Sequence, residues 1–303
     1  MIRTLTYTVG ELIPYINWTY FFHTWGIPPR FAAAADIHDC PACRNRWTDS
    51  LPEEDKNPAR EALHLTDEAR KFLREHAGLL KARVRFGLFP ARSEGDDILI
   101  SGEHTVRLAF LRQQTAQAGS PCLCLADFIA PWQDGGDIAG RLGLFATTVN
   151  EEAVTPCRDD DDFQHLLARI LCDRLAEAAA EKMHEEVRRC HWGYAPNECL
   201  TAAELFAEKY QGLRPAIGYP SLPDLSLIFP IHEVLQMDSI GICLTENGMM
   251  VPHASTCGLM FAHPAACHFG IGPIGEDQLQ DYARRRERSV EEIRRFLASR
   301  ITT

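Results

Sequence analysis

No stretch of this sequence contains the roughly 18 consecutive apolar residues that a membrane-spanning helix needs. The first residues, MIRTLTYTVGELIPYINW, lack the charged leader, apolar run and small-residue cleavage site of a secretory signal. Positive charge is scarce, because 31 Lys and Arg stand against 42 Asp and Glu, for a net charge of -11. We therefore expect a cytoplasmic protein without a membrane span. Nucleic acid is not an expected partner, since it requires a basic surface.

The sequence also lacks the even, regularly spaced cysteines of a disulfide framework. Its 11 cysteines are odd in number and several lie in apolar segments such as PCLCLADF, which indicates reduced thiols. In DIHDCPAC, however, Cys40 and Cys43 are two residues apart, with His38 just upstream. These three residues are weak metal candidates, because a closed structural zinc site needs four ligands. We assign no metal from the sequence, and a metal-dependent protein or a redox pair remains an alternative.

Short strands dominate the central part of the chain. In KARVRFGLFP, apolar and arginine residues alternate from Ala82 to Leu88, the period of two of a half-buried strand, and RSEGDD and ILIS follow as a turn and a returning strand. Further short apolar runs have strand character, namely CLCLADFIA, RLGLFATTV, SIGICLTE, MMVPHAS and GLMFAHP. Several connections are too short for a crossover helix. The expected fold is α+β, a twisted antiparallel β-sheet with flanking helices.

Helical patterns surround these strands. A long helix is expected over about residues 159–189, and on it Asp173, Glu177 and His184 share one stripe at intervals of four and seven. A helix capped by Thr66 is expected to run to about residue 80, and Ser289 opens the final helix with a Ser-x-x-Glu capping box. We expect the chain to form a single domain over residues 1–303. The composition changes over about residues 28–63, where we expect a loop.

The run YQGLRPAIGYPSLPD, residues 210–224, cannot form a helix or a regular strand, since three prolines and two glycines interrupt it. We expect a shaped, extended loop that carries one cation, Arg214, and one aromatic face, Tyr219. This combination suits a small polar ligand with a carboxylate and a ring. The alternative is an ordinary proline-rich connector.

Several long motifs carry a family resemblance over nearly the whole chain. They are YINWTYFFHTWGI, GLFPARSEGDDI, FLRQQTAQAG, CLADFIAP, DDFQHLLARILCDRLAEAAAEKMHEEVR, HWGYAPNECLTAAELFAEKYQG, RPAIGYPSLPD, LTENGMMVPHASTCGLMFAHP and DQLQDYARRR. In this order and with nearly this spacing, they resemble the activation (reactivation) domain of cobalamin-dependent methionine synthase. The resemblance implies that the loop at about residues 28–63 is an insertion, because this segment is longer than its counterpart in the family.

The resemblance implies a function. In that family a flavodoxin-like donor reduces oxidised cobalamin, and S-adenosylmethionine then remethylates cob(I)alamin. The chain would be a stand-alone reactivation subunit that binds S-adenosylmethionine and presents it to cobalamin carried by a separate methionine synthase. It would be the activation component of a methyltransferase, without turnover alone. The alternatives are an activator of a different corrinoid methyltransferase and a non-catalytic docking module that has lost S-adenosylmethionine binding.

The resemblance also implies site residues. In the family's RPAxGYP motif the arginine pairs with the ligand's carboxylate, the small residues bring backbone groups close, and the tyrosine contacts the ligand. The matching positions are Arg214, Ala216, Gly218 and Tyr219. A family carboxylate that favours the cationic ligand matches Glu177.

Two further site positions depart from the family pattern. Asn17 stands where the family has an aspartate, which removes a negative charge beside a cationic ligand. His268 stands where the family has a tyrosine. Asp173 and Arg174 match residues that face the cobalamin-binding domain in the family, so they are expected to contact the partner.

Overall fold

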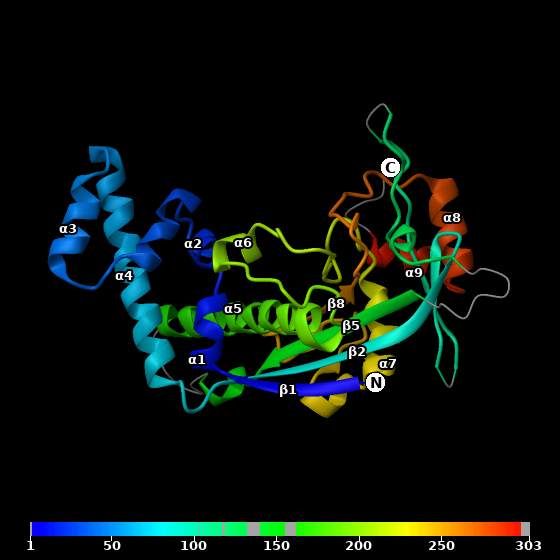
Figure 1. Cartoon of the computed structure of the whole chain (residues 1–303), viewed down its shortest axis with the longest axis horizontal. Helices are drawn as coiled ribbons and strands as arrows, with labels where there is room; N and C mark the ends of the chain where they lie inside the picture. Colours follow the sequence, from blue (N-terminus) through cyan, green and yellow to red (C-terminus); the bar gives the residue numbers. More distant parts are fainter. Residues whose placement is uncertain (1, 103, 117–118, 132–139, 155–161, 298–303) are drawn as a thin grey trace.

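The computed structural model describes residues 2–102, 104–116, 119–131, 140–154 and 162–297, and Figure 1 shows the whole chain. Its main sheet has six strands in the order β4-β3-β2-β5-β8, with β1 added to β2, and neighbouring strands are antiparallel. The strands are β1 (Ile2–Thr8), β2 (Lys81–Glu94), β3 (Asp97–Ile100), β4 (Val106–Ala109), β5 (Gly140–Val149) and β8 (Ser255–Met260). A separate short pair consists of β6 (Cys243–Leu244) and β7 (Met250–Val251). The expected α+β fold with an antiparallel sheet is confirmed.

Two helices cover opposite faces of this sheet. The long helix α5 (Asp162–Glu186) packs on β2, β5 and β8, and α7 (Ile228–Leu235) contacts the same three strands. Side chains of β5 alternate between the two, because Phe145 belongs to the core with α5, whereas Leu144 and Ala146 belong to the core with α7. The period of two read from the sequence therefore separates two apolar cores.

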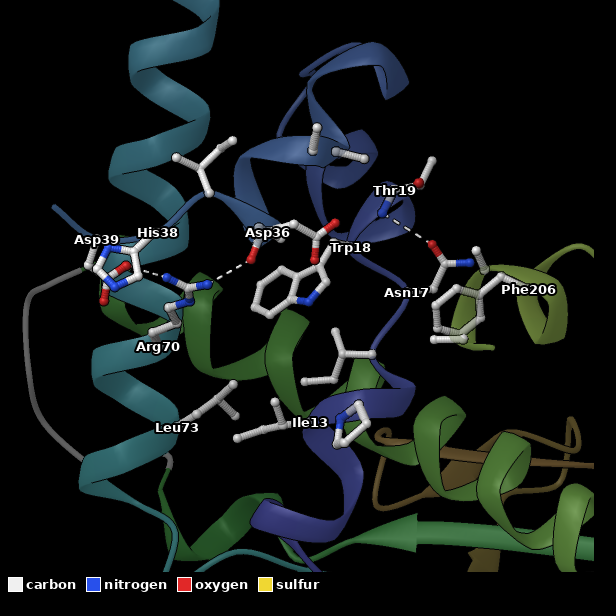
Figure 2. A pocket seen from close by; sticks show the side chains of 18 of the residues that line it. Ile13, Asn17, Trp18, Thr19, Asp36, His38, Asp39, Arg70, Leu73 and Phe206 are labelled. Carbon is white, nitrogen blue, oxygen red and sulfur yellow. Dashed lines mark hydrogen bonds and ion pairs between the residues drawn. The ribbon is translucent and has the colours of Figure 1, made fainter. Parts of the chain in front are cut away.

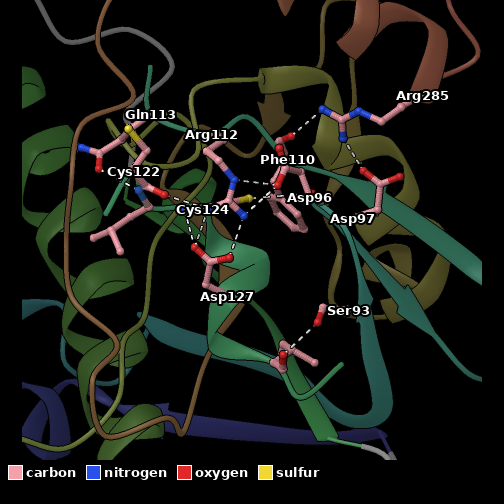
Figure 3. Close-up of polar contacts among 12 residues, drawn as sticks. Ser93, Asp96, Asp97, Phe110, Arg112, Gln113, Cys122, Cys124, Asp127 and Arg285 are labelled. Atoms are coloured by element: carbon pink, nitrogen blue, oxygen red, sulfur yellow. Dashed lines mark hydrogen bonds and ion pairs between the residues drawn. The ribbon is translucent and has the colours of Figure 1, made fainter. Parts of the chain in front are cut away.

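A third, smaller core lies at one end of the molecule, where α8 (Glu276–Arg285) and α9 (Val290–Phe296) pack together. Ser289 caps α9 by accepting a hydrogen bond from the backbone N–H of Glu292 at 3.1 Å, which confirms the expected helix start. Arg285 anchors α8 to the sheet, since its guanidinium pairs with Asp97 on β3 (Figure 3).

After β1, the N-terminal region is largely helical as far as Glu75. It contains α1 (Val9–Leu12), η1 (Ile13–Tyr15), α2 (Trp18–Thr24), η2 (Pro29–Asp36), α3 (Pro41–Asp49) and α4 (Glu53–Glu75). Residues 28–63, expected to be a loop, thus form η2, α3 and the first half of α4; that this segment is an insertion stays a prediction.

The expected helix start at Thr66 is wrong. Thr66 is buried in the middle of α4, where its hydroxyl donates to the carbonyl of Ala62 at 2.8 Å. The helix begins at Glu53, directly after Pro52, and its first turn carries three carboxylates. Negative charge favours a helix N-terminus, so this turn is the stronger start signal.

The segment CLCLADFIA is not a strand either. It forms a short 3₁₀-helix, η3 (Leu125–Phe128), because the carboxylate of Asp127 accepts the backbone N–H of Cys124 at 2.9 Å. The guanidinium of Arg112 forms ion pairs with this carboxylate and with that of Asp96 (Figure 3). A local capping carboxylate here outweighs the strand propensity of the apolar residues.

The expected long helix over residues 159–189 corresponds to α5 and the start of the π-helical turn η5 (Val187–His191), while residues 159–161 lie outside the described part of the chain. The remaining elements are η4 (Glu151–Ala153), α6 (Ala202–Phe206), η6 (Leu225–Leu227) and η7 (Met237–Ile240). Within the described ranges, no helix combines the length and the apolarity that spanning a bilayer requires.

Candidate ligand-binding site

The proline-rich loop after α6 runs as an extended segment along β8. The backbone groups of Leu213 and Phe261 exchange two hydrogen bonds of 2.9 and 2.8 Å. Two residues on, the carbonyl of Pro215 accepts the N–H of Leu259 at 3.0 Å. Proline fits here because its missing donor is not needed at this position of the pairing. The loop is therefore held to the sheet by backbone bonds.

Glycines allow the close approach of this loop. A Cβ on Gly258 of β8 would lie 2.2 Å from the carbonyl oxygen of Pro215 and 2.7 Å from the Cα of Ala216. Gly212 has φ +94°, and a Cβ there would lie 2.3 Å from the carbonyl oxygen of Phe261. Larger residues at either position would push the loop away from β8.

A cavity of about 120 Å³ opens between this loop, α5 and the N-terminal helices. It brings together five of the seven residues expected to bind the ligand, which come from three distant parts of the sequence. The lining consists of Tyr15, Asn17, Tyr20, Arg174, Glu177, Glu181, Leu205, Phe206, Glu208, Arg214, Ala216, Tyr219 and Thr256.

Arg214 and Glu181 pair within this cavity, with Nη2 and Oε2 2.6 Å apart. Both side chains are largely buried. Arg214 Nε and Glu181 Oε1 are buried and have no hydrogen-bond partner among the described residues. The guanidinium therefore keeps donor capacity for a carboxylate.

The cavity carries more negative than positive charge. Three carboxylates, those of Glu177, Glu181 and Glu208, face two guanidiniums, those of Arg174 and Arg214, which leaves one negative charge. Aromatic rings complete the wall. An anionic, aromatic-lined cavity with one arginine suits a ligand that has a carboxylate, a positive charge and a ring.

A second cavity of about 390 Å³ adjoins the first, since Arg174, Glu177, Ala216, Tyr219 and Thr256 line both. Its other walls are more apolar than those of the first cavity and include residues of β8 and residues 248–250.

Asp173 lies on the wall of this second cavity, with Oδ1 3.4 Å from His253 Nδ1. Burial raises the pKa of the Asp173 carboxyl, although His253 opposes the shift. Its neighbour Arg174 is largely buried and lies 3.4 Å from Glu177. Both residues therefore belong to the cavity walls, and their expected contact with a partner stays a prediction.

Asn17 caps α2, because its Oδ1 accepts the N–H of Thr19 at 3.1 Å. Figure 2 shows its side-chain amide beside the ring of Phe206. Asn17 also lines a larger cavity of about 970 Å³, which extends toward α4. We place the site in the smaller cavities, since they gather the carboxylates and Arg214.

His268 and Gly218 lie outside the lining of both smaller cavities. His268 Nε2 is 3.1 Å from Glu208 Oε1, and its ring centroid is 5.7 Å from that of Tyr219. The hydrogen bond from His268 lowers the pKa of the Glu208 carboxyl. Gly218 has φ +92° and donates its N–H to the carbonyl of Leu222 at 2.9 Å. Both residues shape the loop around Tyr219.

Sequence reasoning did not assign two of the cavity's carboxylates. Glu181 could have been found, because Asp173, Glu177 and Glu181 follow each other at intervals of four on α5. Glu208 carries no comparable signal, since it stands after α6 with φ +53°. Tyr15, Tyr20, Phe206 and Thr256 were missed as well.

The weak metal candidates His38, Cys40 and Cys43 lie together on the surface, with one ligand atom of each within 4.8 Å of the others. Cys40 caps α3, and Cys43 donates its N–H to Cys40 Sγ at 3.4 Å. Hydrogen bonds from Cys43 lower the pKa of the Cys40 thiol to about 7. His38 also lines the cavity of about 970 Å³.

Comparisons with known proteins show the family of the chain. Residues 8–287 match the family model of the vitamin B12 dependent methionine synthase activation domain. Among solved structures, the chain is similar to a crystal structure of the MetH reactivation domain bound to AdoHcy, with a TM-score of 0.86 and 36% sequence identity. That match covers 100% of this chain and 91% of the other.

Proposed function

This chain belongs to the family of vitamin B12 dependent methionine synthase activation domains, and on that premise we propose that it binds S-adenosylmethionine in the Arg214 cavity. The family match over residues 8–287 confirms the resemblance inferred from the sequence motifs. One observation carries the proposal: Arg214, Tyr219, Glu177 and Asn17 line one cavity. A related domain binds AdoHcy, the product that remains when S-adenosylmethionine gives up its methyl group.

Each part of the ligand has a matching group in the site. The guanidinium of Arg214 takes the ligand's carboxylate, for which charge-assisted bonds are the strong choice. Glu177 and Glu181 lie on the same stripe of α5 and favour the ammonium and sulfonium charges. The partly exposed ring of Tyr219 offers a face to the adenine.

The residues of the chain act by position. They hold the methyl group on the sulfonium sulfur at a fixed place and exclude water from one side of it. This is a proximity effect. Cobalamin on the partner, as cob(I)alamin, supplies the nucleophile that accepts the methyl group. This account assigns no general acid or base to the chain.

We further propose that the cobalamin sits on a separate methionine synthase, which would approach the cavity where Asp173 and Arg174 line its wall. A flavodoxin-like protein would supply the electron. The cytoplasm is the proposed compartment, as the family implies.

Reconstitution tests this function. The purified chain is mixed with the cob(II)alamin form of a methionine synthase core, a chemical reductant and S-adenosylmethionine, and methylcobalamin is followed by its absorbance. We expect methylcobalamin with the wild type and with Arg3→Ala, which removes an exposed arginine elsewhere. We expect none with Arg214→Ala. Equal yields without the chain would refute the proposal.

Asn17 and His268 favour a second candidate, a docking module that has lost its ligand, because both depart from the family pattern. An activator of another corrinoid methyltransferase is the third. Copurification from the source cells separates the candidates: a methionine synthase supports the first, and a different corrinoid protein supports the third. Docking without S-adenosylmethionine binding supports the second.

A further inference from the structure

A zinc-binding site at the start of α3 is the inference we propose, formed by His38, Cys40 and Cys43. His38 and Cys40 come from the short turn between η2 and α3, and Cys43 comes from the first turn of α3. Their ligand atoms lie within 4.8 Å of one another. Donor atoms around one zinc ion lie about 3.5 to 4 Å apart, given bond lengths near 2.0 Å to nitrogen and about 2.3 Å to sulfur. Rotation of side chains on the surface closes the difference.

The local backbone prepares these donors. Cys40 is the N-cap of α3, and Pro41 at the first helical position fixes the turn between the two cysteines. The N–H of Cys43 points at Cys40 Sγ, at 3.4 Å, which favours a thiolate there. The N–H of Cys40 donates to His38 Nδ1 at 3.2 Å and places the imidazole beside the sulfurs. Zinc would take this Nδ1 lone pair in place of the hydrogen bond. Two thiolates would balance the charge of one divalent ion.

The histidine distinguishes a metal site from a plain dithiol. Two cysteines in a Cys-x-x-Cys turn are enough for a disulfide, whereas a third donor that converges on both sulfurs is a feature of zinc coordination. Both thiols are free in the structure.

The fourth coordination position is open. Asp39 is the nearest carboxylate in sequence, but its Oδ1 is held by Arg70 at 2.5 Å and by Arg44 at 3.2 Å. Figure 2 shows His38 and Asp39 beside Arg70 at the edge of the larger cavity. His38 and Cys43 are exposed, so water or a small thiol completes the site. Bound zinc would link the turn between η2 and α3 to the first turn of α3.

Zinc stoichiometry and affinity test the site. The reduced full chain is stripped with chelator, titrated with Zn²⁺ against a chromophoric competitor and dialysed, and its metal content is measured by mass spectrometry. We expect one zinc per chain. Cys40→Ser and Cys43→Ser should each weaken binding by at least about 100-fold, and His38→Gln by about 10-fold or more. Cys190→Ser, which changes an exposed cysteine elsewhere, should leave the affinity unchanged.

Cobalt serves as a spectroscopic probe of the same ligands. Co²⁺ added to the wild type should give thiolate-to-metal absorption and the visible bands of tetrahedral cobalt, and both should disappear in Cys43→Ser. Thermal unfolding should shift upward with Zn²⁺ in the wild type and not in Cys43→Ser. Zinc content well below one per chain or equal affinity in the cysteine variants would each overturn the site.

Discussion

Arg214 and Glu181 are joined by an ion pair in the cavity wall, with Nη2 and Oε2 2.6 Å apart and the two side chains 14% and 11% exposed. Arg214 comes from the extended loop on β8, and Glu181 comes from α5. The pair thus joins the loop on β8 to the helix that also carries Glu177 of the cavity wall.

Loss of the arginine should cost stability as well as binding. Arg214→Ala leaves Glu181 buried beside no positive partner, so we expect the free energy of unfolding to fall by about 3 kcal/mol. The double variant Arg214→Ala, Glu181→Gln removes the stranded charge and should recover most of this loss. Urea unfolding followed by circular dichroism measures both. Equal instability of the single and double variants would contradict the ion-pair account.

Restoring a carboxylate at position 17 should strengthen ligand binding. Asp is as good an N-cap as Asn and is favoured by the helix dipole, so Asn17→Asp keeps α2 intact. A charge-assisted contact to a cationic ligand adds about 1 kcal/mol, which lowers the dissociation constant about fivefold. Asn17→Ala is the control, because it loses the cap without adding a charge. A weaker complex with Asn17→Asp would place the cation elsewhere.

The contact between β8 and the loop should tolerate no side chain at Gly258. In Gly258→Ala the new Cβ meets Pro215 and Ala216, so we expect a stability loss of about 1 to 3 kcal/mol and weaker ligand binding. Gly270→Ala is a matched control, since its nearest neighbour would be Pro220 Cβ at 3.8 Å. Thermal unfolding and calorimetric titration of both variants check the expectation. Unchanged binding in Gly258→Ala would show that the loop position is not critical.

Stability should fall in acid because of His184. The side chain is fully buried, and burial, helped by Arg188 and Arg214, holds its pKa well below the ordinary value. Below about pH 6.5 the unfolded chain binds a proton that the folded chain does not, so stability decreases as the pH falls. From about pH 7.5 to about pH 5.5 the wild type should lose about 1 kcal/mol more than His184→Gln.

Urea unfolding at the two pH values measures this difference. The exposed residue His23 provides the control, since His23→Gln should keep the pH dependence of the wild type. A pH dependence that is the same in His184→Gln as in the wild type would contradict the assignment.

The sequence predicted the parts of the fold that depend on local pattern. The hairpin of β2 and β3 follows from alternation and a Gly-containing turn, and the cap of α9 follows from Ser289. The start of α4 was misplaced, because Thr66 has the residue type of a cap but sits in a buried turn. The prediction of a strand around Leu125 was wrong, because the carboxylate of Asp127 caps a short 3₁₀-helix at this position.

The grouping of residues around the cavity was predictable where they share a motif or a helix stripe. Arg214 and Tyr219 stand in one loop motif, and Glu177 lies on α5. Glu208 was not predicted, because its position beside His268 depends on how the chain folds after α6. The convergence of His38 with the two cysteines likewise depends on turn geometry that spacing alone does not fix.

Calorimetric titration of S-adenosylmethionine into the purified chain is the most direct test of the proposed site. The account predicts binding to the wild type and to Arg3→Ala, and loss of binding in the stable double variant Arg214→Ala, Glu181→Gln. Binding that survives in the double variant would place the ligand outside this cavity. No binding to the folded wild type, alone or together with a cobalamin-binding methionine synthase, would contradict the central claim.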